Sequence, residues 1–229
     1  GEWLIKREQL VSDIKELQKE NEALRQENEE LSVTNNALLQ EKHELTELRN
    51  LYQLDQTYAD FPKTGCRIIA KENGSWYHSF VIDKGSEDGL SVDMNVLADG
   101  GLVGRITYIG RHWSRVQAVI DDNSNVSATV LSSQKNLIVS GNLTLYEEGT
   151  ISFSELADPD DLVKVGDSVV TSNISDKYLP GILIGYISEI QTDPNNLTKS
   201  GRITPAVDFS RLDTVLVIQK LKQTAEDDG

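Results

Sequence analysis

Two phrases, LSVDMNVL at residues 90–97 and VKVGDSVV at residues 163–170, decide the fold, because each begins the same ordered series. The first is followed by GLVGRI (residues 101–106), and the second by PGILIGYI (residues 180–187). RVQAVID (residues 115–121) then matches RITPAVD (residues 202–208), and a valine-rich run follows near Val130 and near Val217. Four landmarks in one order indicate two copies of a β unit of roughly 75 residues; the alternative is that β turns merely reuse Gly and Asp.

Two glycines, Gly104 and Gly185, occupy the same place in the two copies, inside sequence that otherwise favours strands. A glycine at such a position marks a bulge or the tight corner of a small closed barrel. We therefore treat Gly104 and Gly185 as structural corner glycines, where a side chain would meet a forbidden backbone angle or a neighbouring strand.

The rest of the chain from Cys66 consists of short runs rich in Val, Ile and Thr, separated by turn residues. Such runs are typical of a sandwich or a barrel, and closure of a barrel removes exposed sheet edges. The runs are 66–70, 79–83, 95–98, 101–109, 115–120, 126–131, 137–139, 143–147, 150–153, 168–171, 182–191, 201–207 and 214–219. We expect a mainly β protein with two small chymotrypsin-like six-stranded β-barrels in tandem, preceded by an N-terminal α-helical coiled coil.

The coiled coil is predicted between Trp3 and Tyr52, where leucine recurs every seven residues and neither Gly nor Pro occurs. With the leucines at d, the a positions include three asparagines, which favour a parallel, in-register dimer because each can pair with its twin across the axis. Only Ile14 is a well-packed a residue, so the dimer should be weak. The expected dimerisation residues are Leu10, Ile14, Leu17, Asn21, Leu24, Asn28, Leu31, Asn35, Leu38 and Leu45. The alternative is a long helix packed on its own domain.

The expected division of the chain follows these patterns. A coiled-coil dimerisation helix occupies 1–55, and a linker broken by Pro62 and Gly65 occupies 56–65. The first barrel is expected over 66–135 and the second over 136–222, and terminal strands are free to cross between them. The polar residues 223–229 are expected to be a disordered tail.

Composition excludes several classes of function. Lys and Arg number 22 against 37 Asp and Glu, which gives a net charge of −15 and argues against nucleic acid or an anionic membrane surface as a partner. Cys66 is the only cysteine, and the three histidines, His43, His78 and His112, show no metal-ligand spacing. We therefore expect no metal site and no cofactor.

A serine nucleophile is the one catalytic candidate worth testing in a pair of six-stranded barrels. Gly166-Asp167-Ser168 resembles the nucleophile region of chymotrypsin-like proteases, but Val169-Val170 follow where that family has glycines that shape the oxyanion hole. His78 or His112 could act as the base only by coincidence of folding. We expect no catalytic residue.

Six segments form an ordered set: 81–90, 101–106, 114–116, 166–172, 180–185 and 205–208. As a set, these segments resemble the MreC family of bacterial cell-shape proteins. The resemblance covers residues 52–221 together with the preceding coiled coil, and Asn173 departs from the glycine that is common in relatives. It implies a non-enzymatic homodimer that acts with a class B penicillin-binding protein, RodA and MreD in peptidoglycan synthesis.

The resemblance also implies a location. Such proteins are single-pass proteins of the cell membrane, with the coiled coil and barrels outside the cytoplasm. This chain begins with Gly1-Glu2 and has no run of about 18 apolar residues, so we expect the span to lie in upstream sequence. Two alternatives remain open: a secretion or periplasmic adaptor, which usually has two antiparallel helical arms where this chain has one, and an inactive protease-like barrel pair.

Overall fold

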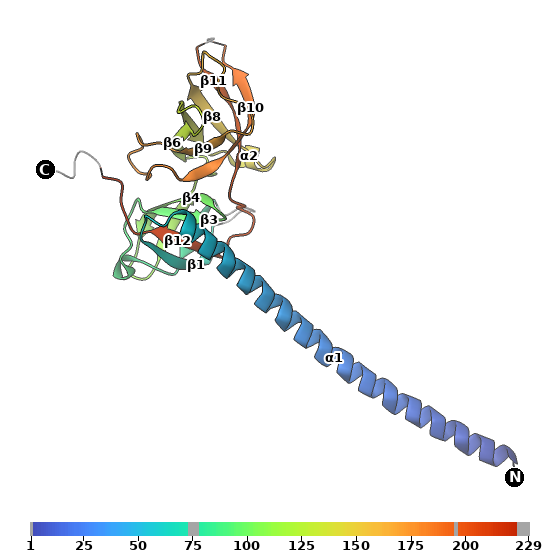
Figure 1. Ribbon diagram of the computed structural model, residues 1–229. Helices are drawn as coiled ribbons and strands as arrows, with labels where there is room; N and C mark the ends of the chain where they lie inside the picture. The colour runs from blue at the N-terminus through green and yellow to red at the C-terminus, as the bar shows by residue number, and fades with distance from the viewer. Residues whose placement is uncertain (1, 73–77, 195–196, 224–229) are drawn as a thin grey trace. The chain divides into compact units, whose positions relative to one another are not determined.

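The computed structural model describes residues 2–72, 78–194 and 197–223, and the chain divides into two compact units, residues 1–49 and 50–229 (Figure 1). Its elements are α1 (Glu2–Thr57), β1 (Lys63–Lys71), β2 (Ser79–Ile82), a 3₁₀ turn (Ser86–Asp88), β3 (Asn95–Ala98), β4 (Gly101–Ile109), β5 (Ser114–Ala118), β6 (Asn125–Val130), β7 (Asn136–Ser140), α2 (Leu143–Tyr146), β8 (Ile151–Leu156), β9 (Ser168–Thr171), β10 (Leu183–Thr192), β11 (Lys199–Pro205) and β12 (Thr214–Ile218).

The long helix α1 forms because its sequence contains no Gly or Pro and is rich in Glu, Leu, Lys and Gln. It continues two residues beyond the expected end of the coiled coil. The linker is also shorter than 56–65, because β1 begins at Lys63, where Lys63, Thr64 and Gly65 pair with Ile218, Val217 and Leu216 of β12. These partners come from the far end of the chain, so local sequence could not reveal them.

The strands form two closed six-stranded barrels, as the sequence predicted. The order around the first barrel is β1-β12-β3-β4-β5-β2, and the order around the second is β7-β6-β9-β10-β11-β8. All neighbouring strands pair antiparallel. Corresponding places in the two orders are occupied by strands six apart in number: β1 corresponds to β7, β2 to β8, and so on to β6 and β12.

The sixth strand of each copy closes the opposite barrel. Strand β6 lies between β7 and β9, and β12 lies between β1 and β3, so each copy gives one strand to its neighbour. In Figure 1, β12 (red) accordingly lies beside β1 (teal), at the other end of the colour scale. The crossing of terminal strands that the sequence left open is therefore present: the β6–β7 hairpin lies wholly in the second barrel, and residues 214–218 return to the first, so the boundary at 135/136 does not separate the barrels.

The exchanged strands are core elements of the barrels that receive them. In β12, Val215, Val217 and Ile218 have no exposed surface, and in β6 neither Ala128 nor Val130 has any. Removing such residues from water stabilises by about 1.5–3 kcal/mol for each large aliphatic side chain. Neither barrel can fill its core without a strand from the other copy, so the two barrels form one interdependent unit.

One expected strand is a helix. Residues 143–147 have β-forming composition, but Leu143–Tyr146 form α2 because the side chain of Asn142 accepts a hydrogen bond from the Leu145 backbone N–H at 2.9 Å. Asparagine at this position caps a helix, and the cap outweighs the strand propensity of a short run. The Tyr146 ring packs edge-on against Phe209 and is the one buried side chain of α2. Of the expected tail, 224–229 lie outside the described residues.

Candidate interaction surfaces

The predicted dimerisation residues lie along α1, and all ten are exposed in the single chain. The leucines at d are between 49 and 63 % exposed, and Ile14 is 47 % exposed. Trp3 and Tyr52 extend the same d series by one heptad at each end and are also exposed. Pairing with a second copy stays a prediction.

Gly104 and Gly185 occupy equivalent positions in β4 and β10. Each directly follows an extra residue in its strand, Val103 or Ile184, where the register with the neighbouring strand shifts. A Cβ atom at residue 104 would lie 1.9 Å from the Gln117 carbonyl oxygen, and one at residue 185 would lie 2.2 Å from that of Thr204. Close approach of a neighbouring strand is thus the reason for glycine at both places.

The catalytic candidates do not form a serine triad. His78 Nδ1 lies 3.2 Å from Asp121 Oδ2 in the first barrel, while Ser168 belongs to β9 of the second. Burial would raise the pKa of the Asp121 carboxyl, but hydrogen bonds from Asn123, Gln117 and His78 outweigh it and lower the pKa. His112 is largely exposed beside Glu87. Within 2–72, 78–194 and 197–223, no group of three or more acidic, His or Cys side chains could hold a metal ion.

Two side chains that sequence reasoning missed join the barrels. Asn95 in β3 donates to the Lys177 carbonyl oxygen at 2.9 Å and accepts from the Leu179 N–H at 2.8 Å. The Tyr58 hydroxyl, just beyond α1, accepts from the Leu183 N–H at 3.1 Å and donates to the Gly100 carbonyl at 3.3 Å. Because Asn95 is 1 % exposed, its amide would be costly to leave unpaired. These contacts fix the mutual placement of the barrels.

The second barrel carries a groove of about 410 Å³, which we call the β6–β9 groove. Its lining includes Thr129 and Leu131 at the end of β6, Val170 in β9, and Ile174 in the connection that follows. Leu131 is 55 % exposed and Ile174 68 %. The lining contains no charged side chain, although the chain has a net charge of −15. The groove is therefore uncharged, with exposed aliphatic side chains beside polar ones.

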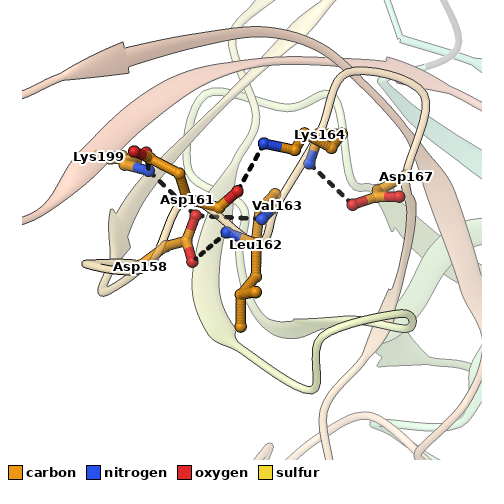
Figure 2. Close-up of polar contacts among 7 residues, drawn as sticks. All are labelled: Asp158, Asp161, Leu162, Val163, Lys164, Asp167 and Lys199. Carbon is orange, nitrogen blue, oxygen red and sulfur yellow. Dashed lines mark hydrogen bonds and ion pairs between the residues drawn. The ribbon is translucent and has the colours of Figure 1, made fainter.

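The β8–β9 connection, which precedes β9 in the sequence, contains a network of polar contacts around Asp158 (Figure 2). Asp158, which is fully buried, accepts hydrogen bonds from the Leu162 and Val163 N–H groups at 3.0 and 3.1 Å and from Lys199 Nζ at 3.0 Å. Burial would raise the pKa of the Asp158 carboxyl, but these bonds lower it. Leu162 and Val165 stay exposed on the loop. Sequence reasoning did not single out Asp158.

The barrels match a known family. Residues 68–219 match the family described as "Rod shape-determining protein MreC, barrel core". This chain belongs to the MreC family. Its relatives include the cell shape-determining protein MreC of Listeria monocytogenes, which is 30 % identical over 224 residues, or 95 % of this chain and 75 % of that protein. MreC of Bacillus subtilis is 28 % identical over 218 residues, or 92 % of this chain and 75 % of that protein.

Solved MreC structures share the fold. The Listeria monocytogenes MreC structure is 27 % identical and aligns with a TM-score of 0.65 over 87 % of this chain and 99 % of that chain. A Helicobacter pylori structure described as a complex between penicillin-binding protein (PBP2) and MreC aligns with a TM-score of 0.54 over 70 % of this chain and 99 % of that chain, at 14 % identity. Among the described residues of this MreC chain, no helix has the length and apolar character needed to cross a membrane.

Proposed function

We propose that this MreC chain is a non-enzymatic scaffold that dimerises through α1 and docks the peptidoglycan synthesis machinery on its barrels. The proposed partners are a class B penicillin-binding protein, RodA and MreD. The observation that carries the proposal is membership of a cell shape-determining family, together with a relative of the same fold that is described as bound to PBP2. The proposed location is the outer side of the cell membrane, with the anchoring span in upstream sequence.

The β6–β9 groove is the surface that we propose for the penicillin-binding protein. A neutral, partly apolar groove on an acidic protein avoids the cost of desolvating charge when an apolar segment docks. Exposed aliphatic residues at its rim supply the apolar area that dominates the centre of protein interfaces. Asn95 and Tyr58 hold the barrels in one arrangement, which reduces the ordering that binding would otherwise require.

The coiled-coil seam of the proposed dimer is weak, so the dimer depends on a high local concentration of helices. The asparagines at a positions weaken the coiled coil, and anchoring in a membrane would raise the local concentration of helices. Replacing Asn28 with Leu should tighten self-association, which analytical ultracentrifugation would measure. A chain that stays monomeric at all concentrations, even with Asn28→Leu, would contradict a parallel dimer.

Deleting residues 23–36 from the full-length protein in cells tests the scaffold as a whole. This change removes two heptads, so the leucine register is kept while the helix shortens by about 21 Å. We expect dimerisation to persist and crosslinking to the penicillin-binding protein to fall, because the barrels stand closer to the membrane. Normal wall growth and undiminished crosslinking would argue for a purely self-assembling structural role instead.

A further inference from the structure

A smaller cavity of about 230 Å³, here named the junction pocket, lies where the two barrels meet. Arg105 in β4 and Gln117 in β5 line it from the first barrel. Ser124 and Asn125, at the start of β6, and Lys177 and Tyr178, in the β9–β10 connection, line it from the second. The lining is mostly polar, so the pocket is unlike the β6–β9 groove, and its role is independent of the proposed function.

The charge of the junction pocket is opposite to that of the chain. Two cationic side chains, Arg105 and Lys177, line it, and no carboxylate is in the lining. Asp121, outside the lining, accepts hydrogen bonds from the Gln117 side chain and the Asn123 N–H, which do line the pocket. Asp93 lies behind Arg105, with 2.5 Å between Asp93 Oδ1 and Arg105 Nη1. Lys177 is exposed, and its ammonium has no ion-pair partner within the described residues. Local positive charge on an acidic protein concentrates anions at that point.

The pocket also has hydrogen-bond donors to spare. A guanidinium has five N–H groups; Asp93 accepts from one nitrogen of Arg105, and the Tyr178 hydroxyl is also hydrogen-bonded to Arg105 and to Ser124. The Arg105 side chain is only 19 % exposed, so its remaining donors are held in place rather than free to move with solvent. Tyr178 is 4 % exposed, and burial raises the pKa of its hydroxyl, which therefore stays protonated beside Arg105. Fixed donors around a positive centre match the acceptor oxygens of an anion.

We propose that the junction pocket binds a small oxyanion, a carboxylate or phosphate group, between the two barrels. A purely structural role would explain the Asp93–Arg105 pair but not the unpaired Lys177 that lines the same cavity. The bound anion would connect β4 and β5 of the first barrel to β6 and the β9–β10 connection of the second. Its binding would therefore add to the contacts of Asn95 and Tyr58 that hold the barrels together.

Thermal unfolding of the full chain, titrated with sodium phosphate or with sodium acetate, tests this site. Sodium chloride at matched ionic strength separates specific binding from screening. We expect saturable stabilisation by at least one anion, because a ligand that binds only the folded state raises the melting temperature with its concentration. Stabilisation by phosphate alone identifies a phosphate-bearing ligand, and stabilisation by acetate alone identifies a carboxylate. A shift no larger than that with chloride for both anions overturns the proposal.

A matched pair of variants locates the site. Lys177→Gln removes one charge from the pocket, and the Lys177 contact with Asn95 is made by its backbone carbonyl, so the fold should be kept. Lys135→Gln makes the same change of charge in the β6–β7 turn, outside the pocket lining. We expect Lys177→Gln to weaken anion binding about tenfold, on the scale of one charged hydrogen bond, and Lys135→Gln to leave it unchanged. Equal weakening in both variants, or in neither, would overturn the assignment.

Discussion

Replacing Gly104 with alanine should destabilise the protein far more than the added methyl group would suggest. The new Cβ atom would lie 1.9 Å from the Gln117 carbonyl oxygen and 2.9 Å from the Ala118 Cα atom. Both are backbone atoms of β5, which pairs with β4 through Gly104 and Ala118. The clash therefore cannot be relieved by rotating a side chain, and the two strands must move apart by about 1.5 Å before the contact becomes an ordinary one.

The magnitude follows from three contributions. Overpacking of a close-packed site costs about 1–3 kcal/mol. Each ladder hydrogen bond that the separation breaks costs about a further 0.5–1.5 kcal/mol. Alanine restricts the unfolded chain and returns about 0.4–1 kcal/mol. With one broken ladder bond these ranges combine to a net loss of about 0.5–4 kcal/mol for Gly104→Ala, and each further broken bond adds to it. Gly185→Ala should fall in the same range, because its Cβ would lie 2.2 Å from the Thr204 carbonyl oxygen.

Urea unfolding followed by near-ultraviolet circular dichroism measures this loss, because the signal comes from packed aromatic residues rather than from α1. Gly65→Ala is the matched control: Gly65 also lies in a paired strand, but its Cβ would be 3.9 Å from Leu216 Cδ2, an ordinary contact. The control should be neutral or slightly stabilising. If Gly104→Ala and Gly185→Ala both unfold within about 0.5 kcal/mol of the parent, close approach is not the reason for these glycines.

Three further outcomes follow from the barrels. Ending the chain at Asp213 removes β12, which pairs with β1 and β3 of the first barrel. Amide hydrogen exchange should therefore show loss of protection in β1 and β3. Loss confined to the second barrel would contradict the exchange of strands. Burial raises the pKa of the Cys66 thiol to about 12, so a thiol reagent at pH 8 should label it only after unfolding, and rapid labelling of the folded chain would contradict its burial. The pKa of Asp158 is lowered in the folded protein, so its carboxylate contributes stability that is complete above the unfolded pKa of about 3.9 and is lost as pH falls through the folded pKa. Asp158→Asn should remove this part of the pH dependence of the melting temperature. An unchanged pH profile in the variant would refute the contribution of Asp158.

Sequence reasoning reached the barrels because each copy repeats turn and strand landmarks in the same order. Gly104 and Gly185 were visible for the same reason, since a glycine inside a strand stands out against Val and Ile. The repeat even included the strands near Val130 and Val217. Which barrel these strands enter was not visible, because strand pairing depends on contacts far apart in sequence, and a β-forming run carries no mark of its partner.

The interaction surfaces were harder to predict than the fold. Asn95 reads as an ordinary strand residue and Tyr58 as an ordinary linker residue, yet both make hydrogen bonds to segments more than 80 residues away in the sequence. The β6–β9 groove and the junction pocket each combine residues from segments that only folding brings together. The heptad repeat of α1 is local and can be read directly from the chain, but its pairing with a second copy stays a prediction.

Isothermal titration calorimetry of the purified chain with the extracytoplasmic part of a class B penicillin-binding protein from the same organism tests the scaffold most directly. The account predicts saturable binding that Ile174→Asp, at the rim of the β6–β9 groove, weakens by at least about tenfold, because a charge must then be desolvated at the interface. Val92→Asp, at an exposed aliphatic residue outside the groove, should leave the affinity unchanged. No heat of binding from a folded chain, or equal loss in both variants, would contradict docking on this groove.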